Sequence, residues 1–257
     1  MNKETDIFKI GIDAGSTTMK IIVIDYNNDI LYKSYRRHKA EINLLFSEEM
    51  YKIGKLFPEK QFIVNITGSA GMGISERTGI PFIQEIVASV EVIKQLYPNT
   101  RTMIDLGGED SKMVFFSANK QPDIRMNGSC AGGTGAFIDQ MADLMNIPIE
   151  ELGELAMKFD KIYPIASRCG VFAKTDVQNL ISRNIPLPDI SMSILHTVAL
   201  QSITSLTRGQ EITPEILLLG GPLTFIQALR DSFKNILKVD LILPENSEYF
   251  QIGRAHV

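Results

Sequence analysis

Short segments in which apolar and polar positions alternate, or which run apolar with β-branched residues, recur along the chain and predict β-strands. The predicted strands are Ile7–Asp13, Met19–Tyr26, Ile30–Tyr35, Gln61–Thr67, Arg101–Asp105, Lys112–Ser117 and Glu215–Leu219. Turn-forming residues follow Asp13 and Asp105 directly, so each of these strands forms a predicted hairpin with the next one.

Between these strands the apolar residues recur at helical spacing, which predicts amphipathic helices. The predicted helices are Ala40–Leu56, Glu85–Leu96, Thr134–Met145, Ile149–Phe159, Val171–Arg183, Pro188–Arg208 and Leu223–Ile236. Strands and helices therefore mix along the chain, which is typical of an α/β protein.

A hairpin whose turn carries Asp and Gly occurs twice, around Asp13 and around Asp105, each followed by helical segments. This repetition predicts two similar lobes, residues 1–96 and 97–251, each presenting a hairpin turn to a shared nucleotide cleft. The alternative interpretation is a coincidence between two generic α/β halves.

Composition excludes several classes of protein. No run of eighteen apolar residues occurs among the 257, and the polar N-terminus lacks the apolar core of a secretory signal, so we expect a cytoplasmic protein without a membrane span. The net charge of −4 and the short basic cluster 36–39 argue against nucleic-acid binding. Two cysteines cannot form a disulfide framework.

The final residues, Ile252–Val257, read like translated sequencing-adapter DNA. We expect them to be a non-native tail and assign no role to His256. The natural chain is then expected to continue beyond Gln251.

The turn after the first strand has the composition of a phosphate-binding site. Gly15 allows backbone amides to approach an anion closely, and the hydroxyls of Ser16, Thr17 and Thr18 can donate to phosphate oxygens. Lys20 adds a positive charge, and Asp13 suits an outer-shell ligand of Mg²⁺, which keeps several of its waters. An ordinary hairpin turn, which favours the same residue types, is the alternative.

Two further glycine turns extend this pattern. In the second, Asp105 and Glu109 flank Gly107-Gly108 and could orient the waters of a metal ion or an attacking water. An acidic, solvated turn is the simpler interpretation. In the third, a buried strand enters Gly220-Gly221, where an adenosine could pack against bare backbone.

In this order and spacing the three turns resemble those of the actin, Hsp70 and sugar-kinase superfamily of ATPases, which have a two-lobed, ribonuclease H-like fold. The resemblance spans nearly the whole chain. Neither a Walker phosphate loop nor a GxGxxG motif after the first strand is present.

Each of the two cysteines, Cys130 and Cys169, comes at or just before the first turn of a predicted helix. Helix N-termini stabilise thiolates and anionic iron–sulfur clusters. One chain offers two thiols where a [4Fe–4S] cluster takes four, so a two-fold symmetric dimer would complete the set. Inert buried thiols are the alternative, although they would not need the surrounding glycines.

The segments NGSCAGGTGAFID, with Cys130, and SRCGVFAKTD, with Cys169, resemble those of the activator ATPases of 2-hydroxyacyl-CoA dehydratases. This BadF/BadG/BcrA/BcrD-type family includes the ATPase subunits of benzoyl-CoA reductase. The resemblance implies a homodimer that holds one [4Fe–4S] cluster through Cys130 and Cys169 of both subunits. ATP hydrolysis with Mg²⁺ then drives one electron onto a dehydratase or reductase partner under anaerobic conditions, with reduced ferredoxin or flavodoxin as the donor.

By the same resemblance, Asp13, Asp105 and Glu109 are catalytic. Nucleotide contacts fall to Gly15, Ser16, Thr17, Thr18, Lys20, Gly107, Gly108, Gly220 and Gly221. The smaller activators tend to have Gln where Glu109 stands, which is a departure from the family pattern. The cysteine segments look more like the N-terminal module of a long fused activator.

Two other functions remain open from the sequence. A small-molecule kinase of the same superfamily, of the N-acetylhexosamine type, predicts a phosphorylated product and a colourless protein, with Asp139 or Asp176 as a candidate base. A non-enzymatic, ATP-gated assembly module predicts nucleotide-dependent binding that tolerates Cys130→Ser with Cys169→Ser.

Overall fold

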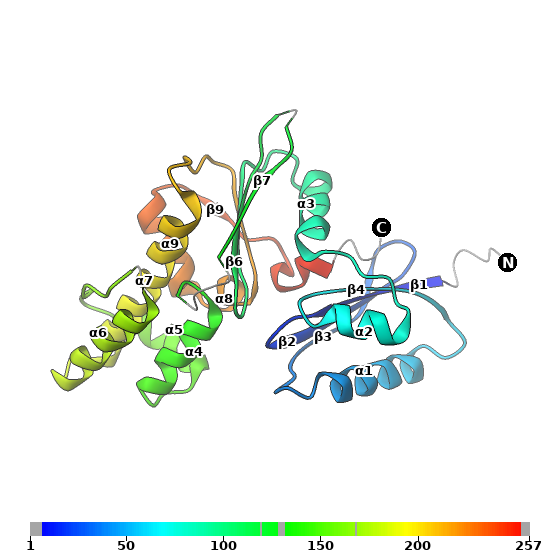
Figure 1. Cartoon of the computed structure of the whole chain (residues 1–257), viewed down its shortest axis with the longest axis horizontal. Helices are drawn as coiled ribbons and strands as arrows, with labels where there is room; N and C mark the ends of the chain where they lie inside the picture. Colours follow the sequence, from blue (N-terminus) through cyan, green and yellow to red (C-terminus); the bar gives the residue numbers. More distant parts are fainter. Residues whose placement is uncertain (1–6, 119, 128–131, 168, 253–257) are drawn as a thin grey trace. The chain divides into compact units, whose positions relative to one another are not determined.

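The computed structural model describes residues 7–118, 120–127, 132–167 and 169–252, and it divides them into two compact units (Figure 1). Unit 1 contains residues 7–98 together with 249–252, and unit 2 contains residues 99–248. The boundary falls after Pro98, and unit 1 is built from two separate stretches of the chain. The sequence prediction had divided the chain into 1–96 and 97–251.

Unit 1 is built on a mixed sheet with the strand order β3-β2-β1-β4. The strands are β1 (Ile7–Ala14), β2 (Thr18–Ile24), β3 (Ile30–Arg37) and β4 (Gln61–Thr67). The first three form an antiparallel meander, and β4 pairs parallel to β1 after a crossover through a helix. The meander follows from the two short turns, whereas parallel pairing requires the longer helical connection.

The helices of unit 1 are α1 (Ile42–Leu56), α2 (Gly71–Thr78) and α3 (Glu85–Leu96). Ile12 and Ile21 of the sheet are fully buried in a cluster that also contains Leu45 and Ile53 of α1. The segment 249–252 contributes Tyr249 and Ile252 to a second apolar cluster with residues of β2.

Unit 2 contains a five-stranded sheet of order β7-β6-β5-β8-β9. Its strands are β5 (Thr102–Leu106), β6 (Ser111–Phe115), β7 (Asp123–Asn127), β8 (Ile216–Leu219) and β9 (Leu241–Ile242). Strand β6 is antiparallel to both β5 and β7, and β8 pairs parallel to β5. All residues of β5, β6 and β8 are buried, which matches the continuous apolar run of β8. Strands β5 and β6 also bury polar residues, among them Asp105 and Lys112.

The two sheets repeat one arrangement. Strands β1, β2, β3 and β4 of unit 1 have the same order and directions as β5, β6, β7 and β8 of unit 2. The register repeats as well, because Asp13 pairs with Lys20 across the first hairpin and Asp105 pairs with Lys112 across the second. The recurrence of the hairpin in the sequence therefore reflects a repeated topology.

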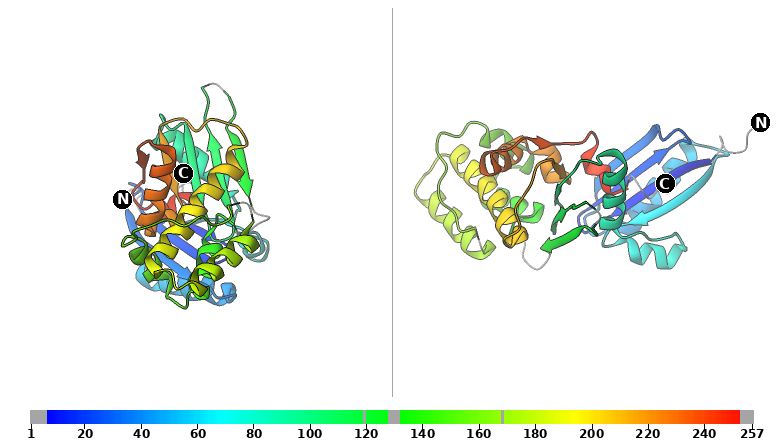
Figure 2. Two further views of the ribbon diagram at one scale, coloured as in Figure 1. Left: turned by 90° about the vertical axis from the view of Figure 1, so that its left-hand side faces the viewer. Right: turned by 90° about the horizontal axis from the view of Figure 1, so that it is seen from above.

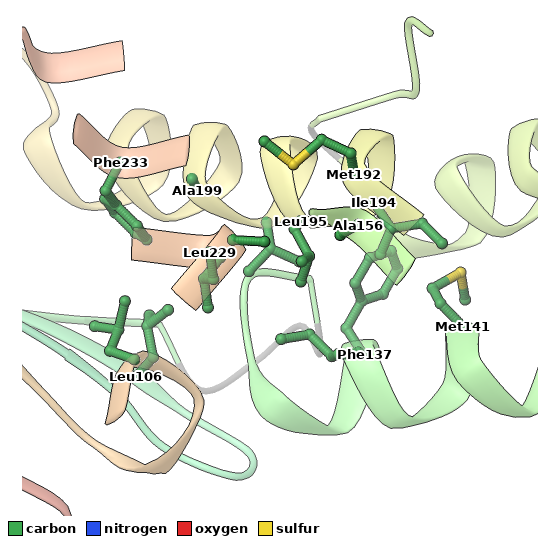
Figure 3. Packing of buried hydrophobic residues seen from close by; sticks show 14 of the residues in the cluster. Leu106, Phe137, Met141, Ala156, Met192, Ile194, Leu195, Ala199, Leu229 and Phe233 are labelled. Carbon is green, nitrogen blue, oxygen red and sulfur yellow. The ribbon is translucent and has the colours of Figure 1, made fainter. Parts of the chain in front are cut away.

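The helices of unit 2 are α4 (Gly135–Leu144), α5 (Ile149–Ala156), α6 (Gly170–Ser182), α7 (Leu187–Thr207), α8 (Gly221–Phe225) and α9 (Gln227–Leu237). Helix α7, yellow in both views of Figure 2, lies among the other helices of this unit. Figure 3 shows its side chains Ile194 and Leu195 packed near Phe137 of α4 and Leu229 of α9. This cluster forms the main core of unit 2.

Helix α7 is buried on several faces and nevertheless carries hydroxyl side chains. Ser193, Thr197 and Ser202 satisfy their hydroxyls by donating to the backbone carbonyl oxygens of the preceding turn, at 2.6 to 2.9 Å. Within the described part of the chain, none of the helices combines the length and the apolar character needed to cross a membrane.

Several predicted elements differ from the observed ones for local reasons. Helix α1 begins at Ile42 rather than Ala40, because Lys39 and Ala40 have positive φ angles of 47° and 67°. The predicted helix Leu223–Ile236 is two helices, since the backbone is extended at Ile226. Helix α2 and the polar edge strand β7 were not predicted.

Candidate nucleotide and cysteine sites

The first predicted phosphate turn follows β1 in unit 1. Asp13 and Lys20 face each other across the hairpin, and the Lys20 Nζ atom lies 2.9 Å from Asp13 Oδ2. Both residues are buried, with 3% and 7% of their surface exposed. A buried ion pair of this kind is costly to break, because either partner alone would remain an uncompensated charge.

Lys20 is also tied to the returning segment of unit 1. Its Nζ donates to Gln251 Oε1 at 3.1 Å. Burial by itself lowers the pKa of Lys20, but the negative charge of Asp13, with smaller contributions from Tyr35 and Glu85, raises it above its ordinary value. Lys20 is therefore a cation at neutral pH, and its charge is largely balanced by Asp13.

The turn itself is a tight hairpin connection with donors available to an anion. The Gly15 amide donates to the Thr18 carbonyl oxygen at 3.0 Å. Ser16, Thr17 and Thr18 are half-buried, and their hydroxyls make no hydrogen bond among the described residues. These three hydroxyls can therefore donate to phosphate oxygens.

His38 also lies at this turn, although it was not among the site residues predicted from the sequence. Its Nε2 is 3.1 Å from the Gly15 carbonyl oxygen, and its backbone amide donates to Thr17. The basic cluster 36–39 thus supports the first turn from β3. Arg36 in the same cluster pairs with Glu48 and Glu49 of α1.

Gly68, directly after β4, is required by the close packing beneath this turn. It has a φ of +90°, and a Cβ there would lie 2.4 Å from both the Ala14 carbonyl oxygen and Asp13 Oδ1. Only glycine fits such a position without moving its neighbours. Gly68 therefore allows the carboxylate of Asp13 to lie against the backbone at the end of β4.

The second predicted turn, between β5 and β6, repeats this geometry in unit 2. Its residues Asp105 and Lys112 are buried, and the Gly107 amide donates to the Asp110 carbonyl oxygen at 2.9 Å. Lys112 Nζ lies 2.8 Å from Asp110 Oδ2, so the lysine contacts a turn carboxylate here. Glu109 is exposed in the same turn.

The third predicted turn follows β8, and Gly220 takes the place that Gly68 has in unit 1. Its φ is +92°, and a Cβ there would lie 2.1 Å from the Leu106 carbonyl oxygen and 2.6 Å from Asp105 Oδ1. Gly220 precedes α8, which begins at Gly221. The structure thus brings the second and third predicted turns together around Asp105.

The second turn is also bonded to the start of α4. The Gly135 amide donates to the Gly107 carbonyl oxygen at 3.0 Å, and the Ala136 amide donates to Gly108 at 2.6 Å. A Cβ at Gly135 would approach Gly107 and Pro222 at 3.2 Å. The first residues of α4 therefore contact both glycine turns of unit 2.

Of the two predicted cluster ligands, the structure describes Cys169 only. Cys130 lies outside the described residues. Cys169 is a free, half-buried cysteine at the N-cap of the thirteen-residue helix α6, as the sequence indicated. After Gly170, the side chains of Val171 and Phe172 are 73% and 67% exposed. Cys169 thus stands at the start of a helix beside an apolar exposed surface.

The two cysteine segments meet through their glycines. A Cβ at Gly170 would lie 3.8 Å from the Gly132 amide nitrogen and 3.7 Å from the ring of Phe137 in α4. Gly133 has a φ of +80° and lies close to Ser202 of α7. The glycines around the cysteines therefore permit close backbone packing between α4, α6 and α7.

Among the described residues, no group of three or more His, Cys, Asp or Glu side chains is placed to hold a metal ion. Cys169 nevertheless suits iron bound through thiolates, because it is free and lies at a helix N-terminus next to the Gly132 segment. Asp176, a candidate base for a sugar kinase, accepts a hydrogen bond from the Ala166 amide at 2.8 Å.

Sequence reasoning did not assign several residues that shape these sites. Gly68 and Gln201 contact residues that are distant in the sequence. Asp110 pairs with Lys112, two residues away within the same turn. Gly68 had one available signal, since it directly follows a predicted buried strand, as Gly220 does.

Several proteins of known function or structure are similar to this chain in sequence and in fold. The 2-hydroxyisocaproyl-CoA dehydratase activator of Clostridioides difficile is 30% identical over 220 residues, covering 84% of this chain and 81% of the activator. A solved structure of an activator of the 2-hydroxyisocaproyl-CoA dehydratase from Clostridium difficile with bound ADPNP is 26% identical, with a TM-score of 0.85 over 97% of this chain and 92% of that one.

The fold extends to sugar kinases. A ROK family glucokinase from Streptomyces griseus in complex with glucose and AMPPNP has a TM-score of 0.53, at 11% identity, over 97% of this chain and 98% of that chain. This similarity confirms the predicted fold class. The pattern of the BadF/BadG/BcrA/BcrD ATPase family matches residues 10–249. The chain belongs to the BadF/BadG/BcrA/BcrD ATPase family.

Proposed function

We propose that the chain is an ATPase that activates a 2-hydroxyacyl-CoA dehydratase or a related reductase by ATP-dependent transfer of one electron. The contact that carries this proposal joins the second glycine turn to the cysteine region. Gly107 and Gly108 accept hydrogen bonds from the first amides of α4, and the chain just before α4 packs against the start of α6.

Nucleotide binding is assigned to the three turns. In unit 1, Gly15, Ser16, Thr17, Thr18 and Lys20 would contact phosphate, and Asp13 would help to hold Mg²⁺ through its waters. In unit 2, Gly107, Gly108, Gly220 and Gly221 contact the nucleotide, with Asp105 and Glu109 as the catalytic carboxylates. The buried carboxylates, the free hydroxyls and the bare glycine backbone support this assignment. The ADPNP-bound relative supports it as well.

The cysteines supply the electron-transfer part of the proposal. Cys130 and Cys169 of two subunits would hold one [4Fe–4S] cluster, which supplies a one-electron donor when bound. Cys169 is suited to this because the amides at the start of α6 stabilise a thiolate. The exposed Val171 and Phe172 provide an apolar surface next to that thiol.

Coupling follows from the bonds at α4. A change in the Gly107-Gly108 turn when ATP is hydrolysed displaces the acceptors of Gly135 and Ala136, and hence the N-terminus of α4. Because Gly132 precedes α4 and touches the start of α6, such a displacement reaches both cysteine segments. A dehydratase or reductase is the proposed electron acceptor, and reduced ferredoxin or flavodoxin is the proposed donor.

Purification without oxygen tests this proposal directly. We expect a brown homodimer with about four irons per dimer, an EPR signal after reduction, and loss of iron in Cys169→Ser but not in the control Thr175→Ser on the same helix. Both variants should still hydrolyse ATP. A colourless protein that phosphorylates an N-acetylhexosamine would show instead that the chain is a kinase.

A further inference from the structure

Gln201 of α7 lies beside both cysteine segments of unit 2. Its residue surface is only 4% exposed, and its Nε2 donates to the Ala166 carbonyl oxygen at 3.4 Å. A Cβ at Gly132 would lie 3.0 Å from Gln201 Oε1 and 3.3 Å from Nε2. One buried amide therefore contacts the segment that follows Cys130 and the segment that precedes Cys169.

Neighbouring side chains hold the same segments from other sides. The Ser202 hydroxyl, which donates to the Val198 carbonyl oxygen at 2.9 Å, also lies 3.3 Å from the Gly133 carbonyl oxygen, and the Asn127 side-chain amide donates to the Gly132 carbonyl oxygen at 3.4 Å. Asp176 of α6 accepts the Ala166 amide at 2.8 Å. The segment around Gly132 and the segment around Ala166 are thus each held by separate hydrogen bonds, whereas Gln201 contacts both segments.

The oxygen of this amide has no hydrogen-bond partner among the described residues, although it is buried. Leaving a buried polar atom unpaired costs about 1–3 kcal/mol, and such atoms in native structures call for an explanation. An apolar side chain of the same length would fill the space without this cost. The bond from Nε2 to Ala166 is therefore the contact that accounts for an amide at this buried position.

We propose that Gln201 is a positioning residue that sets the separation between the backbone at Gly132 and the backbone at Ala166. Resting on the proposed function, this means that Gln201 sets the spacing at which the segments of Cys130 and Cys169 meet an iron–sulfur cluster. Residues that orient the ligands of a metal typically change its affinity 10–100-fold when they are lost. Gln201 acts in this way from a helix that itself carries neither cysteine.

Three variants separate this role from simple packing. Gln201→Met keeps the length and volume but removes both hydrogen-bonding groups, and Gln201→Asn keeps the amide but shortens its reach. Gln178→Met makes the first change at an exposed position of α6 and serves as the matched control. Gln201→Asn is the milder variant and keeps the test valid should Gln201→Met fold poorly.

The first measurement is hydrogen exchange in the iron-free protein. We expect Gln201→Met to raise exchange in peptides covering 132–137 and 163–167, with Gln201→Asn intermediate and the rest of unit 2 unchanged. Exchange that is unchanged, or that rises evenly over unit 2, would overturn the positioning role.

The second measurement is the release of iron to a chelator after anaerobic reconstitution of the full chain. We expect release about tenfold faster or more in Gln201→Met than in the wild type or Gln178→Met, with an altered EPR line shape. Iron uptake with equal release rates in all variants would overturn the positioning role while the proposed function stood. If Gln201→Met raised local exchange as expected but the wild type bound no iron, the positioning of the two segments would stand and the proposed function would be overturned.

Discussion

The backbone amide of Gly135 donates to the carbonyl oxygen of Gly107, so the first residue of α4 is bonded to the second glycine turn at 3.0 Å. This bond lies between a turn assigned to nucleotide and a segment assigned to a cysteine, both within unit 2. It gives the proposed coupling a definite atomic route, and the route can be tested by adding a single methyl group.

Gly135→Ala should weaken the coupling. The added Cβ approaches the Gly107 carbonyl oxygen and Pro222 at 3.2 Å, so the turn or the helix must shift, at a cost of about 1–3 kcal/mol for overpacking. We expect bound nucleotide to slow hydrogen exchange at the amides of 132–137 in the wild type. In Gly135→Ala we expect this protection to be lost.

Gly54→Ala is the matched control for this change. Gly54 is a helical glycine in α1 with no atom within 4 Å of an added Cβ. The substitution should stabilise unit 1 by about 0.5–1 kcal/mol through helix propensity, and it should leave the nucleotide effect intact. Equal nucleotide protection in Gly135→Ala and Gly54→Ala would contradict the proposed route.

Gly68→Ala should damage the first turn severely. An alanine at this positive φ costs about 1–2 kcal/mol in backbone strain alone. The Cβ would also lie 2.4 Å from Asp13 Oδ1, which forces the carboxylate to move. We expect a lower urea midpoint by circular dichroism and weaker binding of a fluorescent ATP analogue.

Gly79 provides the comparison, because its φ of +74° is also positive but nothing lies within 4 Å of an added Cβ. Gly79→Ala should show the strain cost of about 1–2 kcal/mol without any loss of nucleotide affinity. If both alanine variants bound the analogue as the wild type does, the packing of Gly68 under Asp13 would have no role in binding.

Lys20→Met should destabilise unit 1 by about 3–5 kcal/mol, because Asp13 would be left charged and buried. The pair Asp13→Asn with Lys20→Met should cost less than the sum of the single changes. Urea unfolding of the four proteins measures this coupling, and additive costs would show that the ion pair contributes little.

The pH dependence of this pair has a definite sign. Since the folded state raises the pKa of Lys20 above 10.5, the contribution of the pair is complete below that pH and is lost only as the pH rises through the higher folded value. The difference between the wild type and Lys20→Met should therefore stay constant from neutral pH to about pH 10.

Glu49 of α1 predicts the opposite pH dependence. Its burial alone would raise its pKa, but hydrogen bonds from Tyr32 at 2.7 Å and Arg36 at 3.0 Å lower it below 4.5. Its contribution is present above pH 4.5 and is lost as the pH falls through the lowered value. The stability advantage of the wild type over Glu49→Gln, about 1–3 kcal/mol at pH 7, should shrink below that pH.

Glu48→Gln is the control for Glu49, because Glu48 also pairs with Arg36 but its side chain is 49% exposed. Exposed pairs contribute about 0–1 kcal/mol, so Glu48→Gln should leave the acid dependence of unfolding nearly unchanged. The urea midpoint of unfolding, measured as a function of pH, distinguishes Glu48→Gln from Glu49→Gln. Identical curves for both variants would mean that the buried bonds to Glu49 do not stabilise unit 1.

The strands and the glycine turns could be predicted because their signals are local. Alternating apolar residues followed by Asp and Gly indicate both hairpins, and the observed registers pair Asp13 with Lys20 and Asp105 with Lys112. Helix α2 was missed because it is short and begins Gly71-Met-Gly73, which are poor signals for a helix. Strand β7 was missed because it is a polar edge strand.

The contacts of Gln201 could not be predicted for a different reason. Its partner Ala166 is 35 positions away, and the nearby Gly132 is farther still. In the sequence Gln201 is one polar residue in a long helix, with no motif around it. Only the packing of α7 against both segments distinguishes it from an exposed glutamine such as Gln178.

Unit 1 is completed by residues 249–252, which follow the whole of unit 2 in the chain. Tyr249 packs in the cluster with Ile22 and Ile24, and Gln251 accepts a hydrogen bond from Lys20 beside the first turn. At a translation rate of about 5–20 residues per second, the ribosome reaches these residues many seconds after it has made β2. Unit 2 is continuous in the chain and can therefore fold before unit 1 during synthesis. The contact of Lys20 with Gln251 beside the Asp13 turn forms only after unit 2 has been made.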